Sequence, residues 1–228
     1  PPAGFRFAGW WTSEGGKGIM AGENTKFGVG QIWYAYFEPL EFTITIESLK
    51  PVYSDTIEVV GPYTLHVVNG SLYYTDYNNS KNVLIFDAKS YRGYSVSSYL
   101  DENTMEPITG DYRVMTSDMT IDLYLDENKY DLELKFFYDG QYVPAEESFT
   151  ILGWEVGTGT SFHTGSTITG IPYRMIENGL VMPMPVHNNY AFSEMSSSAG
   201  VLPMRNNNYV LTLDAFNGAL ETVITYVM

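Results

Sequence analysis

Cysteine is absent from the 228 residues, which excludes disulfide bonds, thiolate metal sites and a cysteine nucleophile. Basic residues are scarce: 12 Lys and Arg stand against 27 Asp and Glu, for a formal net charge of −15. Phosphate groups would repel such a chain, so we expect neither nucleic acid nor an anionic membrane surface as a partner. No apolar run approaches the ~20 residues that a membrane-spanning helix needs, so we expect no membrane insertion.

An initiator methionine and a signal peptide are also missing, because the chain begins at Pro1-Pro2. We interpret this as a processed or trimmed chain. Together with the acidic, hydrated exterior that the charge implies, it favours an extracellular or cell-surface location. A virion is the alternative.

Patterns typical of helices are nearly absent, whereas apolar and polar residues often alternate. Phe42, Ile44 and Ile46 alternate with Thr43 and Thr45, which predicts a strand with one buried and one hydrated face. The 19 Tyr, 12 Phe and 4 Trp also favour strands, because flat side chains pack well on a pleated surface. Alternating runs occupy residues 41–47, 64–68, 82–86, 119–125, 131–137 and 209–213.

Turn signals separate these runs. Asn-Gly and Asp-Gly pairs tolerate the left-handed backbone of tight hairpins, so we expect short connections between antiparallel strands. The predicted fold class is all-β, as two to three small antiparallel units in tandem that resemble sheets, sandwiches or the β-grasp fold. The turn signals are Asn69-Gly70, Asp139-Gly140, Asn217-Gly218 and Gly61-Pro62.

Two similar segments, residues 7–38 and 91–127, indicate an internal repeat. Each opens with a Gly-aromatic step, Gly9-Trp10 in the first and Gly93-Tyr94 in the second. Each then crosses a polar loop and closes on an aromatic strand that ends in an acid. Repeated units bury their apolar faces against neighbours, which indicates a structural role more than catalysis.

A second recurring element predicts the unit boundaries. Residues 130–140 resemble 209–218, and 40–49 are a looser version. The two half-units at the ends would pair with each other or with a neighbouring subunit, because unpaired strand edges are normally covered; alternatively, the chain was cut within an array. We predict the second half of a unit at 1–39, a full unit at 40–128, a divergent unit at 130–208 and the first half of a unit at 209–228.

The Gly-aromatic steps and closing strands resemble the Listeria–Bacteroides repeat, also called the internalin B-repeat. This resemblance implies a small β-grasp module that occurs in tandem on bacterial surface proteins, and therefore surface interaction in place of chemistry. The second copy departs from the family pattern because it has no Trp. The matching residues are Phe7, Gly9, Trp10, Gly15, Gly16 and 32–37 in the first copy, Tyr91, Gly93, Tyr94, 116–121 and 123–125 in the second, and Gly153-Trp154 in a third.

Self-association through the chain ends is the first predicted interaction, so we expect a homo-oligomer or polymer. The Met-Pro segments within 180–208 are expected at a sheet edge, where proline is tolerated and Met adapts to a partner. The candidate assembly contacts are Phe5, Phe7, Trp10, Trp11, Met182, Met184, Tyr209, Leu211, Leu213, Phe216, Val223 and Tyr226.

A glycan or a protein on a host or cell surface is the second predicted partner. Aromatic rings with a polar end suit such contacts, which makes Tyr73, Tyr74 and Tyr77 candidate glycan contacts. The alternative interpretation of these tyrosines is packing across neighbouring strands.

No catalytic residue, cofactor or metal is assigned, although one Ca²⁺ site is weighed. Asp118, Asp122, Asp126, Glu127 and Asn128 supply the hard oxygen ligands that Ca²⁺ takes. The chain has no Asp-x-Asp-x-Asp-Gly loop, which argues against a Ca²⁺ site of that type.

Acid pairs and histidines give little support for catalysis. We interpret Asp101-Glu102 as part of a solvated hairpin tip, because adjacent acids in a turn do not form the opposed pair that glycoside hydrolysis needs. His66, His163 and His187 lack partners at ligand spacing, and no Gly-x-Ser-x-Gly elbow is present.

These features predict a non-enzymatic structural protein, either a filament or pilus-type subunit or an adhesin segment. It would act through strand pairing and aromatic packing between units. Two alternatives stay open: a virion structural protein, such as a phage tail, fibre or head-decoration subunit, and a carbohydrate-binding module.

Overall fold

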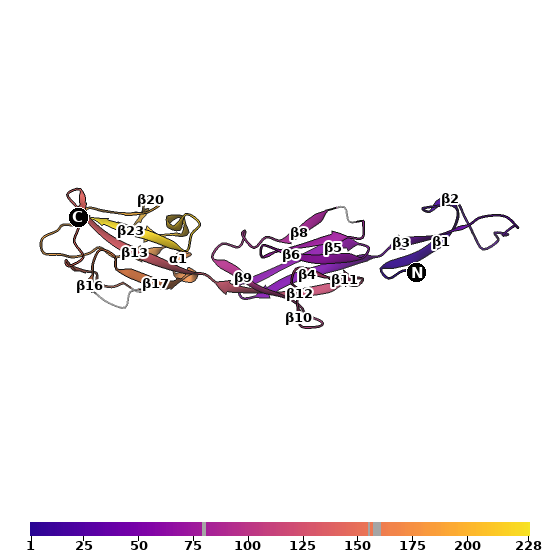
Figure 1. Cartoon of the computed structure of the whole chain (residues 1–228), viewed down its shortest axis with the longest axis horizontal. Helices are drawn as coiled ribbons and strands as arrows, with labels where there is room; N and C mark the ends of the chain where they lie inside the picture. The colour runs from indigo at the N-terminus through magenta and orange to yellow at the C-terminus, as the bar shows by residue number, and fades with distance from the viewer. Residues whose placement is uncertain (79–80, 155, 157–160) are drawn as a thin grey trace. The chain divides into compact units, whose positions relative to one another are not determined.

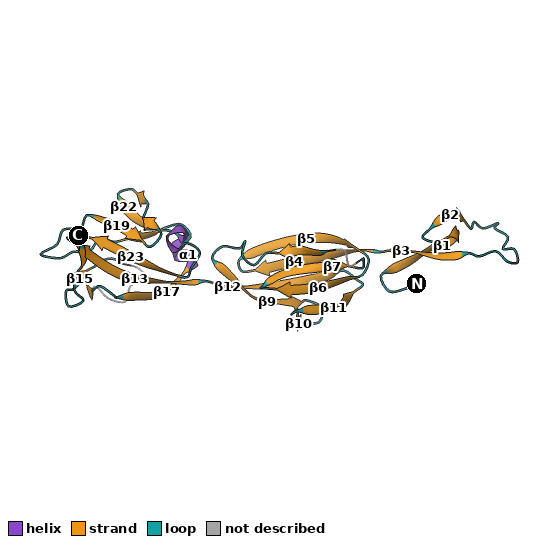
Figure 2. Cartoon of the chain, turned by 45° about the horizontal axis from the view of Figure 1, so that its top comes forward, coloured by secondary structure: helices purple, strands orange, loops and turns teal. Residues whose placement is uncertain are grey.

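The computed structural model describes residues 1–78, 81–154, 156 and 161–228. About 56% of it is strand and 4% helix, which confirms the all-β class. The chain divides into two compact units, Pro1–Asp126 and Glu127–Met228. Figure 1 follows the elements along the chain, and Figure 2 shows strands in nearly every part of it.

The first unit begins with a three-stranded antiparallel sheet, called here the N-terminal sheet. Its strand order is β2-β1-β3, so β1 is central and pairs with both neighbours. The register between β1 and β3 shifts between Phe7 and Gly9, and Gly9 has a φ of 118°, which L side chains rarely adopt. The strands are β1 (Phe5–Ser13), β2 (Lys17–Met20) and β3 (Tyr34–Pro39).

A five-stranded sheet follows, in the order β10-β9-β12-β4-β5. Strand β4 alternates buried and half-buried residues along its length, as the sequence predicted for 41–47. Its two neighbours differ, because β5 pairs with it in antiparallel and β12 in parallel orientation. The strands are β4 (Glu41–Leu49), β5 (Val52–Val60), β9 (Tyr94–Asp101), β10 (Glu106–Pro107) and β12 (Met119–Glu127).

A four-stranded sheet, in the order β11-β6-β7-β8, completes the unit. Asn69 and Gly70 join β6 to β7 with φ values of 51° and 80°, which confirms the predicted tight hairpin. The two larger sheets enclose one core, with Ile44, Ile46 and Ile121 from one sheet against Leu65 and Leu72 from the other. The strands are β6 (Tyr63–Val68), β7 (Ser71–Asp76), β8 (Asn82–Phe86) and β11 (Asp111–Met115).

The second unit is built around a mixed sheet in the order β14-β13-β23-β19-β20, with β17 also paired to β13. Asp139 and Gly140 turn β13 into β14 with φ values of 47° and 80°. The strands of this sheet are β13 (Lys129–Tyr138), β14 (Gln141–Tyr142), β17 (Thr167–Pro172), β19 (Glu194–Ser197), β20 (Gly200–Val201) and β23 (Glu221–Val227).

Two smaller sheets and two short helices cover this mixed sheet. Leu180, Met182 and Leu211 from the small sheets share a core with Leu134 and Tyr226 from the mixed sheet. The remaining elements are β15 (Phe149–Thr150), β16 (Ser161–Phe162), α1 (Tyr173–Ile176), β18 (Leu180–Met182), β21 (Met204–Arg205), β22 (Asn208–Leu211) and the 3₁₀ helix η1 (Leu213–Phe216).

In each unit an early strand pairs in parallel with the last strand. The sequence predicted antiparallel pairing alone and so missed these parallel pairs. In the first unit, β4 pairs in parallel with β12, the last strand of the unit. In the second, β13, the first strand, pairs in parallel with β23, the last strand. A parallel pair needs a long connection, and here the whole intervening unit supplies it.

The predicted strand at 209–213 is partly wrong. Strand β22 ends at Leu211, and Leu213–Phe216 form η1, which ends at Asn217 in the left-handed conformation. The change of direction places Ala215 and Phe216 in the core. The structural counterpart of β13 is therefore β4, which matches it in burial pattern and in its parallel partner, and not the segment 209–218.

Candidate functional site

The N-terminal sheet exposes apolar side chains and contributes none to a core. The buried hydrophobic residues of the described chain begin at Phe42, and no residue of 1–39 belongs to either core. Large apolar side chains that are exposed by 45% or more are frequent here. They are Phe7, Trp10, Ile19, Met20, Phe27, Val29 and Ile32.

Aromatic rings in the sheet contact one another. Phe7 lies 5.7 Å from Phe37 and 5.8 Å from Trp10 between ring centroids, and Trp11 lies 6.3 Å from Tyr36. The buried indole N–H of Trp11 has no hydrogen-bond partner among the described residues. These rings form a half-covered layer with no second layer of the described chain packed on it.

The base of this sheet is joined to the rest of its unit by a small number of contacts. The Phe5 and Tyr77 rings meet edge to face at 5.3 Å. The Leu40 amide donates a hydrogen bond to the Gly4 carbonyl at 2.9 Å. An ion pair between Arg6 and Glu38 at 2.8 Å is exposed, so it adds little stability.

The C-terminal members of the predicted assembly set lie in a different environment. Leu213 and Val223 are half-buried, and Met184 is 49% exposed. Strand β23, which carries Val223, pairs with β13 and β19 of its own unit. The C-terminal segment therefore completes the second unit instead of offering a free half-unit. The buried members are Met182, Tyr209, Leu211, Phe216 and Tyr226.

The three candidate glycan tyrosines do not form one surface. Neighbouring residues in a strand point to opposite faces, so Tyr73 and Tyr74 on β7 diverge. Tyr74 packs against the first core, and Tyr77 packs on Phe5. For Tyr74 and Tyr77, packing against neighbouring residues fits the structure better than a shared glycan-binding surface does.

The acids weighed for Ca²⁺ are separated by their own contacts. Asp118 Oδ1 accepts a hydrogen bond from the Thr43 amide at 2.8 Å, just before β12 begins its pairing with β4. Glu127 forms an ion pair with Arg174 and accepts a hydrogen bond from its amide. Within the described ranges, no group of three or more His, Asp or Glu is arranged to hold a metal ion.

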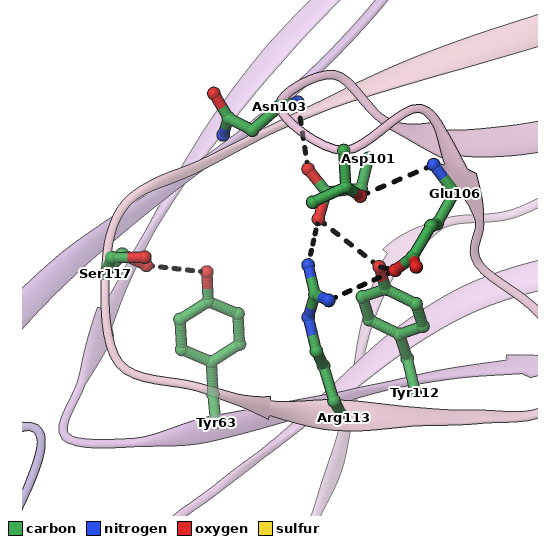
Figure 3. A network of polar contacts seen from close by, with 8 residues as sticks. Tyr63, Asp101, Asn103, Glu106, Tyr112, Arg113 and Ser117 are labelled. Atoms are coloured by element: carbon green, nitrogen blue, oxygen red, sulfur yellow. Dashed lines mark hydrogen bonds and ion pairs between the residues drawn. The ribbon is translucent and has the colours of Figure 1, made fainter.

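The main polar cluster of the first unit is centred on Asp101, whose carboxylate is buried (Figure 3). Its Oδ1 accepts a hydrogen bond from the Asn103 amide at 3.0 Å. Its Oδ2 accepts one from Arg113 Nη2 at 2.8 Å and one from the Tyr112 hydroxyl at 3.3 Å. Glu106 binds the second guanidinium nitrogen of Arg113 at 3.1 Å.

This cluster joins the two larger sheets of the first unit. Asp101 and Glu106 belong to the five-stranded sheet, whereas Tyr112 and Arg113 belong to β11 of the four-stranded sheet. Burial raises the pKa of Tyr112 above its usual value. The predicted exposed position of Asp101 is wrong, since its charge is buried and compensated. We interpret the cluster as a structural clamp, because its charges already satisfy one another.

Tyrosine hydroxyls hold the first unit at further points. Tyr63 donates to the Ser117 carbonyl at 3.0 Å, as Figure 3 shows, and Tyr99 donates to the Gly70 carbonyl at 2.7 Å. Burial raises the pKa of both tyrosines. The first bond ties β6 to the segment that connects the two larger sheets, and the second ties β9 to the hairpin turn of the four-stranded sheet.

The histidines contact different partners. His66 lies in a row across the four-stranded sheet, with Nδ1 2.7 Å from Asp111 Oδ1 and Nε2 2.8 Å from the Thr75 hydroxyl. Thr75 in turn donates to Asn82 Oδ1 at 2.6 Å, so its hydroxyl is already engaged. His187 packs between Phe149 and Tyr190. The His163 ring nitrogen Nδ1 lies 3.0 Å from the Thr164 carbonyl, and the His163 amide donates to the Ser166 hydroxyl at 2.9 Å, both within its own loop.

Sequence reasoning missed part of the exposed apolar set and the whole clamp. A Gly-rich and polar stretch surrounds four of these exposed side chains, so no alternating strand pattern marks them. They are Ile19, Met20, Phe27 and Val29. One signal in the sequence could have pointed to Arg113 as the partner of an acid. It is one of only 12 basic residues in a strongly acidic chain.

A comparison with family models, curated proteins and solved structures gave no match to this chain. In the part of the chain that the structure describes, no helix is long and apolar enough to cross a membrane.

Proposed function

We propose that this chain is a non-enzymatic structural protein, secreted or displayed on a cell surface, that assembles through its N-terminal sheet. The observation that carries the proposal is the absence of a core in residues 1–39, together with the exposed apolar side chains of that segment. A small isolated sheet is only marginally stable in water, and a second layer packed on its apolar side chains would stabilise it. Another β-rich surface would supply this second layer to the N-terminal sheet.

The partner that we propose is a second copy of the chain, so the assembled state is a homo-oligomer or polymer. Aromatic side chains such as Phe7 and Trp10 supply large contact area and are frequent at the energetic centre of interfaces. The two closed units would then act as spacers between assembly points. The resemblance to the internalin B-repeat supports the surface location.

A concentration series tests this proposal in sedimentation velocity. We expect the intact chain to form larger species as its concentration rises, and Phe7→Thr/Trp10→Thr to shift that transition to at least about tenfold higher concentration. Thr keeps the strand preference while it removes the rings.

The matched control removes exposed apolar side chains from strands outside the N-terminal sheet. Leu84 and Val114 are 46% and 65% exposed, so Leu84→Thr/Val114→Thr makes a comparable change elsewhere. The proposal fails if the intact chain stays monomeric at every concentration, or if the control weakens association as much as the change in the sheet.

A further inference from the structure

A second surface, the free edge of β5, has the length and the pattern of a strand-pairing site. Strand β5 has nine residues, and all nine pair with β4 on one side. It ends the five-stranded sheet, so no strand of the described chain pairs along its other side. A long open edge of this kind is a template for another strand.

The backbone groups that face outward from β5 can be assigned from two hydrogen bonds. The Gly61 amide donates to the Leu40 carbonyl at 2.7 Å, which continues the ladder toward β4. The Thr56 amide donates to Asp55 Oδ1 at 2.8 Å, so it points away from β4. Because amide directions alternate along a strand, the outward amides are those of Val52, Ser54, Thr56, Glu58 and Val60.

Asp55 thus covers the central outward amide of an otherwise open edge. Its side chain is on the strand face of Tyr53 and Ile57, yet it is exposed and bends to the neighbouring amide. An inward-facing charge on an edge strand is a known defence against pairing. An amide that is already bonded cannot donate to another strand.

The side chains of β5 match a second copy in antiparallel orientation centred on Thr56. In that register Thr56 meets Thr56, Ser54 meets Glu58, and Val52 meets Val60. The two valines are 85% and 48% exposed, and they would cover each other. The two Glu58 carboxylates avoid each other, because each faces a serine hydroxyl.

We propose that the β5 edge is a latent pairing surface for a second copy of this chain, and that Asp55 holds it closed. The surface is separate from the N-terminal sheet, so this inference does not depend on assembly through that sheet. Opening it requires only that the Asp55 carboxylate release the Thr56 amide.

Single cysteines test both the latch and the register, because the chain has no cysteine of its own. We expect Asp55→Ala/Thr56→Cys to form a disulfide-linked dimer under mild oxidation at least about tenfold faster than Thr56→Cys alone, since a freed amide gains a hydrogen bond in each copy. Asp55→Ala/Glu58→Cys is the register control. In the proposed register residue 58 faces residue 54 of the other copy, so the two cysteines at 58 would be offset by four residues, or about 13 Å, along the strands. They should not cross-link.

Two further variants complete the experiment. Asp55→Asn keeps the acceptor oxygen, so the edge should stay closed and Asp55→Asn/Thr56→Cys should cross-link as slowly as Thr56→Cys. Asp55→Ala/Thr56→Pro removes the outward amide without a cost to the β4 ladder and should abolish any dimer that Asp55→Ala forms. The inference is overturned if cysteine at 56 cross-links no faster than cysteine at 58, or if Asp55→Asn opens the edge as far as Asp55→Ala.

Discussion

Strands β1 and β4 are both nine residues long and rich in apolar residues, but only β4 contributes side chains to a core. Phe42, Ile44 and Ile46 of β4 are at most 7% exposed, whereas Phe7 and Trp10 of β1 are each 45% exposed. The four-stranded sheet covers β4, and no described sheet covers β1. Burial therefore depends on a facing layer and not on the apolar content of a strand.

The second unit extends this comparison. Its last strand, β23, lies between β13 and β19 and contributes side chains to the core, whereas no strand of the N-terminal sheet contributes to a core. Deletion of residues 221–228 removes Ile224 and Tyr226, both fully buried, and leaves β13 and β19 without their shared neighbour. We expect complete loss of the folded second unit. Deletion of residues 1–39 should leave both units folded.

Tryptophan fluorescence measures this difference. Three of the four tryptophans lie in 1–39, so the chain that lacks 1–39 reports the second core through Trp154 alone. A cooperative change in Trp154 emission on denaturation should persist in the chain that lacks 1–39 and should vanish when 221–228 are removed from that chain as well. Retention of that transition without β23 would contradict this role of the strand.

A smaller effect separates the buried clamp from the exposed ion pair of the N-terminal sheet. Asp101→Ala removes the acceptor of the Asn103 amide and of Arg113 Nη2, while Glu106 still binds Arg113, so we expect the free energy of unfolding of the first unit to fall by about 2 kcal/mol. Glu38→Gln should cost at most about 0.5 kcal/mol, because the Arg6–Glu38 pair is exposed. Urea denaturation of both variants measures the contrast, and equal losses would refute it.

Two tyrosines, one in each core, should respond in opposite directions. The buried Tyr226 hydroxyl has no partner among the described residues, so Tyr226→Phe should stabilise the second unit by about 1 kcal/mol. Tyr99→Phe should destabilise the first by about 1 kcal/mol, because Tyr99 donates to the Gly70 carbonyl. Thermal unfolding measures both changes, and a loss of stability in Tyr226→Phe would contradict the assignment of an unpaired hydroxyl.

Alkaline pH should weaken both units in the same way. Burial raises the pKa of Tyr63, Tyr99 and Tyr226 above the ordinary value of 10.0. The folded state holds these protons more tightly than the unfolded chain, so stability is complete below pH 10 and declines as the pH rises above it. Tyr226→Phe should reduce this decline in the second unit, which a pH series of urea denaturation would show.

The local pattern predicted the strands because each has one buried face. The runs at 41–47, 64–68, 82–86, 119–125 and 131–137 all became strands, and the Asn-Gly and Asp-Gly pairs at 69–70 and 139–140 became hairpin turns. Parallel pairing was missed, because Ile44 and Met119 are partners across a whole unit and no local signal joins them.

The candidate site was less predictable for the same reason. Phe7, Trp10, Tyr209 and Tyr226 have similar local patterns, but the first two are exposed and the last two buried. The outcome depends on which strands pack above them. The role of Asp101 was missed because its partner Arg113 approaches from the opposite sheet.

Hydrogen exchange of backbone amides tests most directly the claim that the N-terminal sheet lacks a stabilising layer of its own. In the dilute intact chain, we predict rapid exchange for amides of β1 and β3 and slow exchange for Ile44, Ile121, Leu134 and Ile224 in the closed units. Protection of β1 and β3 should rise with protein concentration as the sheet finds its partner. Amides of β1 protected as strongly as that of Ile44 at every concentration would contradict the account.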